Sequence, residues 1–140
     1  MSKAWPGSQG GTYGGNAVAA AAAVATLDVV RDENLVENAR IRGDELRSGI
    51  ERLQADNPLM GDVRGLGLMQ AVEFVTEHGE PNAALAAAVQ QAAIAENLLL
   101  LTCGTSGNVV RIIPALTVSA EEITVGLDRF CAALRVAQGA

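Results

Sequence analysis

The sequence predicts an α/β (α+β) fold in which helices pack on one small sheet, and two observations carry this expectation. Segments whose apolar residues recur at helical spacing alternate with short segments rich in β-branched residues. The chain of 140 residues, 49% of them hydrophobic and 19% charged, is long and apolar enough to bury a core without disulfides or metals. We therefore expect a layer of helices against a sheet.

The first expected helix covers residues 17–32 and follows a glycine-rich loop, WPGSQGGTYGG, over residues 5–15. Asn16 lies between them and is a suitable N-cap. The helix is built from alanine, valine and leucine and has no polar side before Asp28. Such a helix requires other protein surface to cover it, and we expect it to favour self-association.

A second helix is expected over residues 35–55, where apolar residues recur at helical spacing between arginines and acids, and Asn57-Pro58 ends it. Residues 61–67 are expected to form a glycine-rich turn. This turn leads into a strand over residues 68–75, LMQAVEFV, in which successive side chains face opposite sides.

The remaining elements follow from the same signals. They are an alanine-rich helix over 83–96, a short buried strand over 98–101, a turn over 104–107, a strand over 109–113, and a helix that opens at the capping box Ser119-x-x-Glu122 and runs to about Val136. The expected order is helix, helix, strand, helix, strand, strand, helix.

Charge and hydropathy exclude several classes of function. The 10 basic and 16 acidic residues give a net charge of −6, which repels nucleic acid and anionic membrane surfaces. The apolar run from Ala17 is broken at Thr26 and Asp28, so we expect no bilayer-spanning segment. The opening residues lack the apolar core of a secretory signal, and a cytoplasmic protein is expected.

Metal, nucleophile and dinucleotide motifs are missing from the sequence. Cys103 and Cys131 lie far apart and form no C-x-x-C pair, so we expect ordinary buried thiols and no metal site. His78 lies in a polar loop and is expected to be solvated. Gly65-x-Gly67 lacks the third glycine of a dinucleotide-binding loop and precedes its strand, so it is expected to be a turn.

Two features have the chemistry to bind an anion. The loop that contains Gly11 and Thr12 opens onto a helix, whose N-terminal N–H groups attract anions, although the same glycines also suit a flexible leader. Arg111 interrupts an apolar strand that we expect to be buried, and a buried guanidinium needs an anionic partner. That partner is either an internal acid such as Glu73 or a ligand. Arg64, in the expected glycine-rich turn, is interpreted as structural.

Three segments carry a resemblance to a known family: GGTYGGNAVAAAAAVATLDVV, GDVRGLGLMQAVEF and GNVVRIIPALTVSAEEI. They resemble, in order and at similar spacing, the C-terminal part of the class III aminotransferases, pyridoxal-phosphate (PLP) enzymes that include 4-aminobutyrate aminotransferase. The resemblance covers the chain from about Ala4 onward. It implies the C-terminal small domain of a fold-type-I PLP-dependent transferase together with the long helix that leads into it.

The resemblance also implies roles for individual residues. Thr12, with Gly11 beside it, matches the position that holds the phosphate of a PLP molecule bound mainly by the neighbouring subunit of a homodimer. Arg111 matches the arginine that binds the substrate carboxylate. The implied boundaries are a cofactor-phosphate loop over 1–16, a connecting helix over 17–34 and a small domain over 35–140.

Enzymes of this family need a lysine that forms a Schiff base with PLP. Lys3 is the single lysine of the chain, and it lies too close to Thr12 to match the family's lysine. We therefore expect no catalytic residue and no metal ligand in this chain, no stable PLP binding, and no activity without a large domain. The parent enzyme implied by the resemblance transfers an amino group from an ω-amino acid, such as 4-aminobutyrate, to a 2-oxo acid such as 2-oxoglutarate.

Two alternatives remain open on the sequence alone. The chain is compatible with a free-standing, non-enzymatic module for carboxylate binding or dimerisation. It is equally compatible with a partner subunit that completes the active site of another chain.

Overall fold

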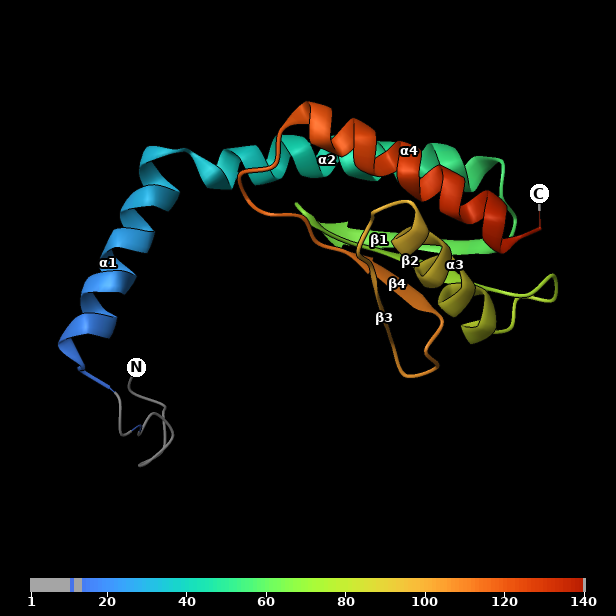
Figure 1. Ribbon diagram of the computed structural model, residues 1–140, viewed down its shortest axis with the longest axis horizontal. Helices are drawn as coiled ribbons and strands as arrows, with labels where there is room; N and C mark the ends of the chain where they lie inside the picture. Colours follow the sequence, from blue (N-terminus) through green and yellow to red (C-terminus); the bar gives the residue numbers. More distant parts are fainter. Residues whose placement is uncertain (1–10, 12–13, 140) are drawn as a thin grey trace. The chain divides into compact units, whose positions relative to one another are not determined.

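A computed structural model describes residue 11 and residues 14–139 (Figure 1). The elements are α1 (Ala17–Asp32), α2 (Leu35–Ala55), β1 (Met60–Leu66), β2 (Met69–Phe74), α3 (Ala83–Ala95), β3 (Leu101–Cys103), β4 (Val109–Ile112) and α4 (Ala120–Ala137). The chain divides between Leu35 and Val36 into two units, and each unit is described by itself.

In the second unit, the four strands form one antiparallel sheet in the order β1-β2-β4-β3. β1 and β2 are joined by a tight turn, whereas β4 comes from much later in the chain and pairs with the other edge of β2. β3 then pairs with β4 at the edge of the sheet. The expected class, helices packed on a small sheet, is confirmed.

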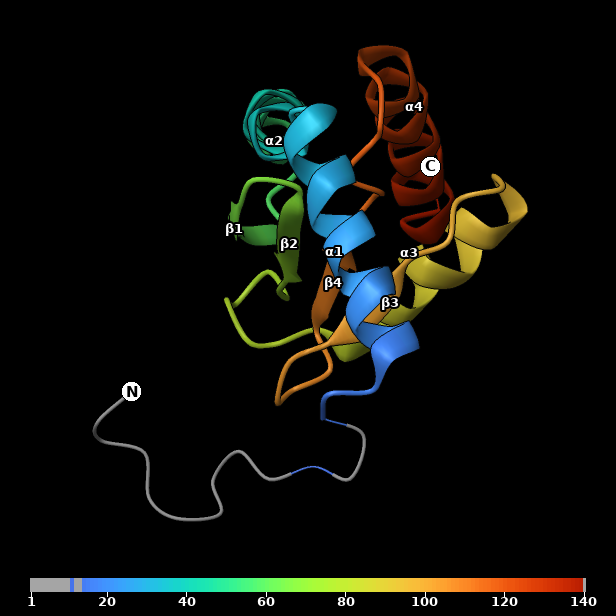
Figure 2. The same ribbon diagram turned by 90° about the vertical axis from the view of Figure 1, so that its left-hand side faces the viewer.

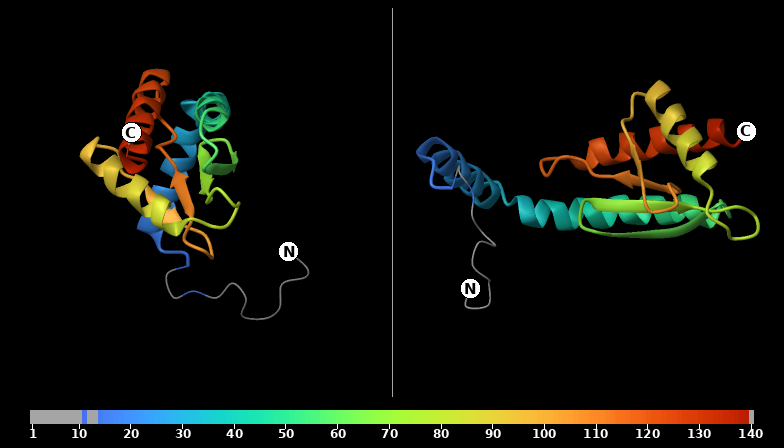
Figure 3. Two further views of the ribbon diagram at one scale, coloured as in Figure 1. Left: turned by 90° about the vertical axis from the view of Figure 1, so that its right-hand side faces the viewer. Right: turned by 90° about the horizontal axis from the view of Figure 1, so that it is seen from below.

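Helices α2, α3 and α4 lie on one side of this sheet, as Figures 2 and 3 show. The core between them is formed by side chains such as Ile50 of α2, Val89 of α3 and Phe130 of α4, which pack against the inward-facing residues of β2 and β4. Val72, Phe74 and Val110 from these strands have no exposed surface. Because side chains alternate along a strand, the intervening residues face the opposite side, which these helices do not cover.

The expected helix caps are confirmed. The side-chain Oδ1 of Asn16 accepts a hydrogen bond from the backbone N–H of Ala19 at 3.0 Å, and α1 begins at the next residue, Ala17. At α4, the Ser119 hydroxyl accepts from the Glu122 N–H at 3.2 Å while the Glu122 carboxylate accepts from the Ser119 N–H at 2.8 Å. Within its own unit, α1 has no buried residue.

The structure contains one strand that the sequence pattern does not predict, and another strand lies elsewhere than predicted. Residues Met60–Leu66, expected to be mostly a turn, form β1, in which Met60 and Val63 face the core. The expected buried strand over 98–101 is wrong: β3 starts at Leu101, whose side chain is 57% exposed. Glycines in β1 hide the alternation of polar and apolar residues, and a run of leucines cannot by itself distinguish a strand from a core-filling loop.

Among the residues that the structure describes, no helix combines the length and the apolar character needed to cross a membrane.

Candidate functional site

Arg111 lies on the face of the sheet opposite the helices. In the strand register, Arg64 of β1, Ala71 of β2 and Arg111 of β4 stand side by side across the sheet. Residues that stand opposite one another in neighbouring strands project to the same face. Arg111 is exposed while its neighbour Val110 is fully buried. The expectation that Arg111 is buried is therefore wrong, because the helices α2, α3 and α4 cover the other face of the sheet.

The internal partner suggested for Arg111 is also wrong. Glu73 accepts a hydrogen bond on Oε2 from Nη1 of Arg64 at 2.7 Å, and on Oε1 from Nδ2 of Asn108 at 3.3 Å. In the described part of the chain, no carboxylate lies within 4.0 Å of the Arg111 guanidinium. Arg111 therefore presents its donors to the open face of the sheet.

Arg64 serves a structural purpose, as expected, but it does so from β1 rather than from a turn. Its Nη1 also donates to the carboxylate of Asp62 at 2.6 Å. These two hydrogen bonds, first to Asp62 and then to Glu73, raise the pKa of the Arg64 guanidinium above its ordinary value. Asp62 and Glu73 stand directly opposite each other in the register, so Arg64 supplies the cation between two carboxylates that would otherwise repel.

Exposed apolar side chains lie on the same face of the sheet as Arg111. Leu101 of β3 stands directly opposite Arg111, and Met69 precedes Ala71 by two residues in β2; both are 57% exposed. Leu66, opposite Met69, is 82% exposed. Exposed apolar groups next to an arginine without a carboxylate partner are suited to a ligand that carries a carboxylate on an apolar chain.

Asn108 is the residue of this neighbourhood that the sequence analysis missed. It is only 3% exposed, and its Nδ2 donates to the backbone carbonyl of Phe74 at 2.9 Å as well as to Glu73. In the sequence it follows Gly107 and resembles another turn residue. Its position immediately before an apolar strand was the one feature of the sequence that could have indicated burial.

The expected phosphate loop lies partly outside the described residues, and Thr12 is among those left out. Gly11 is exposed, and its carbonyl accepts a hydrogen bond from the Gly14 N–H at 3.2 Å. Gly15 has a φ of +83°, which favours glycine, and leads directly to the capped N-terminus of α1. The residues described here supply backbone donors of the kind that hold a phosphate. These residues fit only the phosphate end of PLP, because no described residue is a lysine that could form a Schiff base with the PLP aldehyde.

The phosphate loop and Arg111 belong to different units, and the structure describes each unit by itself.

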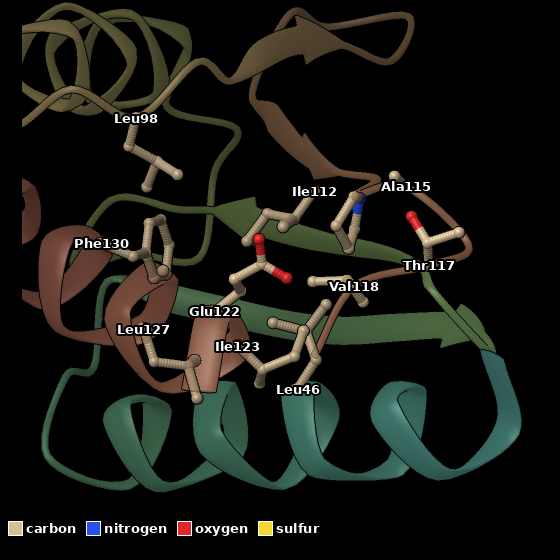
Figure 4. A pocket seen from close by; sticks show the side chains of 12 residues that line it. Leu46, Leu98, Ile112, Ala115, Thr117, Val118, Glu122, Ile123, Leu127 and Phe130 are labelled. Atoms are coloured by element: carbon tan, nitrogen blue, oxygen red, sulfur yellow. The ribbon is translucent and has the colours of Figure 1, made fainter. Parts of the chain in front are cut away.

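A separate pocket of about 320 Å³ lies among α2, α4 and the segment after β4 (Figure 4). Its lining is mostly apolar and includes Leu46, Ile112 and Phe130, with Glu122 as the one charged residue of the lining. A hydrogen bond from the Ser119 backbone N–H, followed by one from its hydroxyl, lowers the pKa of Glu122. Ile112 lines this pocket, whereas Arg111 faces the other side of the sheet, so the pocket is distinct from the Arg111 surface.

His78 and the two cysteines were not expected to form a functional site. His78 is exposed, as expected, and the thiols of Cys103 and Cys131 are half-buried rather than fully buried. Over the described ranges, 11 and 14–139, no group of three or more metal-ligating side chains comes together.

The model of one protein family, "Aminotransferase class-III", matches residues 1–134. The chain belongs to this family. It is 43% identical over 129 residues to a 4-aminobutyrate aminotransferase of Mycobacterium tuberculosis (strain H37Rv), covering 91% of this chain and 29% of that protein. It is 44% identical over 124 residues to a 5-aminovalerate aminotransferase of Pseudomonas putida, covering 87% of this chain and 29% of that protein.

Solved structures of aminotransferases share the fold of this chain. An aminotransferase of Bacillus anthracis aligns with a TM-score of 0.82 at 30% identity, covering 89% of this chain and 29% of that one. An S-selective transaminase from Arthrobacter sp., solved with alanine bound, aligns with a TM-score of 0.81 at 28% identity, covering 99% of this chain and 32% of that one. The class-III aminotransferases depend in general on PLP. This chain spans less than a third of the length of these relatives.

Proposed function

We propose that this chain is the C-terminal part of a PLP-dependent aminotransferase that moves an amino group from an ω-amino acid, such as 4-aminobutyrate, to a 2-oxo acid such as 2-oxoglutarate. The observation that carries the proposal is Arg111, exposed on an open sheet face with no carboxylate partner among the described residues. Family membership and the names of the relatives support the reaction class.

Carboxylate binding is the role proposed for Arg111. Both proposed substrates carry carboxylates, and a guanidinium binds a carboxylate with two parallel hydrogen bonds. Met69 and Leu101 beside Arg111 are exposed and apolar, which suits contact with the methylene groups between the two ends of such a substrate.

Cofactor binding is the role proposed for Gly11 and Thr12, which would hold the phosphate of PLP across the interface of a homodimer. PLP, when bound, supplies the electron sink that amino-group transfer requires. The lysine and the other groups that contact its ring would come from a large domain outside these 140 residues. The chain alone would neither hold PLP stably nor catalyse transamination, and the whole protein would act in the cytoplasm.

The test of Arg111 uses a chimera in which the matched segment of the M. tuberculosis relative is replaced by this chain. We expect the chimera to transaminate 4-aminobutyrate with 2-oxoglutarate. Arg111→Ala should lower kcat/KM by roughly 10- to 100-fold, the factor for losing a hydrogen bond to a charged group. Arg135→Ala, an exposed arginine of α4, is the matched control and should leave kcat/KM unchanged. A chimera that folds, binds PLP and is indifferent to Arg111→Ala would contradict the proposal.

The expected inactivity of the isolated chain has its own test. The 140-residue chain is mixed with PLP and treated with borohydride, which fixes any covalent bond between PLP and an amine. We expect no transamination and no specific product at Lys3, the one lysine of the chain. A stoichiometric adduct at Lys3 would overturn the argument from the position of the lysine.

The exposure of Arg111 within its own unit also favours a second candidate, a non-enzymatic carboxylate-binding module. Saturable binding of 2-oxoglutarate to the chain, detected by calorimetry and lost in Arg111→Ala, is required by this module and is also compatible with the aminotransferase. The size of the endogenous protein decides between the two candidates. An antibody raised to this chain should detect a protein of the relatives' length if the chain is part of a full-length aminotransferase. It should detect a protein of 14.4 kDa if the chain is a free-standing module or a partner subunit.

A further inference from the structure

Glu73 stands diagonally between two arginines on the open face of the sheet. Ala71 is opposite Arg64 on one side and Arg111 on the other, and Glu73 follows Ala71 by two residues on the same face. Diagonal neighbours on a sheet face are about 7–8 Å apart, which long side chains can span. Glu73 is therefore within reach of either guanidinium.

The structure records a pairing with one of the two arginines. Oε2 of Glu73 accepts from Nη1 of Arg64 at 2.7 Å, and Oε1 accepts from Nδ2 of Asn108 at 3.3 Å. In the part of the chain that the structure describes, Arg111 forms no ion pair. Both oxygens of Glu73 are therefore held by groups other than Arg111.

Asn108 and Arg64, which donate hydrogen bonds to Glu73, also bond to other groups. Asn108 is buried, and besides its side-chain bond to the Phe74 carbonyl at 2.9 Å, its own carbonyl accepts from the Phe74 N–H at 2.8 Å. Arg64 is tied to β1 by its bond to Asp62 at 2.6 Å. The carboxylate of Glu73 thus accepts hydrogen bonds from a buried amide and from an arginine of the neighbouring strand that also pairs with Asp62.

We infer that Arg64 and Asn108 are positioning residues, which hold the Glu73 carboxylate away from Arg111 and so keep the Arg111 guanidinium open to a carboxylate ligand. This inference rests on the proposed role of Arg111 in carboxylate binding. An internal carboxylate on Arg111 would compete with the ligand and reduce its apparent affinity by the fraction of Arg111 that remains free. Without Arg64, Asp62 and Glu73 would face each other with no cation between them, which drives Glu73 toward Arg111.

The test measures the side-chain Nε–H signal of Arg111 by nitrogen-15 NMR on the 140-residue chain, first without ligand. In Arg64→Gln we expect hydrogen exchange at Arg111 Nε–H to slow, because Glu73 now pairs with it. The double variant Arg64→Gln/Glu73→Gln should restore the wild-type rate, and Arg64→Lys, which keeps the cation, should stay close to it. The backbone amide spectrum of each variant reports whether it is folded.

The control variant is Arg40→Gln, which removes another exposed arginine, one that pairs with Glu37 on α2 at 2.7 Å. It should leave the Arg111 signal unchanged. If Arg64→Gln likewise leaves that signal unchanged in a folded protein, or if the added Glu73→Gln fails to restore it, the inference is wrong.

A titration with 2-oxoglutarate then separates this inference from the proposed function. We expect a saturable shift of the Arg111 signal, weakened about two- to sixfold in Arg64→Gln, the factor for an exposed ion pair that competes with the ligand. Absence of any shift in the wild-type chain would count against carboxylate binding by Arg111, whereas the ligand-free exchange rates would still decide whether Arg64 controls Glu73. A ligand shift that Arg64→Gln does not weaken would overturn the inference and leave the role of Arg111 intact.

Discussion

Gly43 of α2 packs backbone to backbone against Gly67 in the turn between β1 and β2. A Cβ atom at Gly43 would collide with the carbonyl group of Gly67 and lie 2.6 Å from its Cα. Gly67 has a φ of +53°, a conformation that favours glycine, and so cannot easily move aside. This contact brings α2 down onto the sheet that carries Arg111.

We predict that Gly43→Ala destabilises the chain by roughly 1–3 kcal/mol, because an added methyl group must force α2 away from the turn. Urea unfolding measures the change. Gly126→Ala, in the interior of α4 with no atom within 4 Å of the new Cβ, is the matched control and should stabilise the chain by about 0.4–1 kcal/mol. Equal effects of the two substitutions would contradict the close packing of α2.

Asn108→Ala should lower the free energy of unfolding by about 0.5–1.5 kcal/mol, since it removes the side-chain hydrogen bond to the Phe74 carbonyl, which keeps its backbone donor, the Asn82 N–H. The same urea titration measures it. Gln91→Ala removes an exposed amide of α3 that bonds only to Gln90 among the described residues, and should change stability little. If Asn108→Ala unfolds at the same urea concentration as the wild-type chain, the buried amide does not contribute to stability and the prediction is wrong.

The capping box of α4 predicts a dependence of stability on pH. Hydrogen bonds from the Ser119 backbone and then its hydroxyl lower the pKa of Glu122 in the folded chain, so the stabilisation is present above the pKa of the unfolded state. It is lost as the pH falls through the lower, folded pKa. We expect wild type to be more stable than Glu122→Gln near neutral pH, and this difference to vanish in acid.

Thermal unfolding of both proteins across the acidic range measures that difference. Glu121→Gln, in the same first turn of α4, removes a charge that interacts with the helix dipole but does not belong to the capping box. The Glu122 prediction fails if the two variants have the same pH profile.

Self-association through α1 is the fourth prediction. Val24 and Leu27 are exposed, and α1 has no buried residue within its own unit. Sedimentation equilibrium of the wild-type chain should detect association that increases with concentration, and Leu27→Glu should weaken it by placing a charge on the apolar surface. Val136→Glu on α4, where the side chain is 62% exposed, is the control. A monomeric wild-type chain at high concentration would refute this prediction.

Local signals explain why the helices could be predicted so closely. Asn16 and the pair Ser119 and Glu122 each define a helix start through hydrogen bonds within three residues along the chain. By contrast, β1 was missed and β3 misplaced, because a short strand is defined by its partner. Leu101 lies in a strand because it pairs with Arg111 of β4, and its residue type alone does not predict this.

The candidate site divides in the same way. The sequence by itself determined the family resemblance, the helix boundaries and the choice of Arg111 as the candidate carboxylate-binding residue. Only the tertiary structure decided that Arg111 lies on the uncovered face of the sheet and that Glu73 pairs with Arg64 instead. The physical reason is that these features depend on how β1 and β2 pair with β4, which comes from much later in the chain. This register is set by packing of the other face of the strands against the helices.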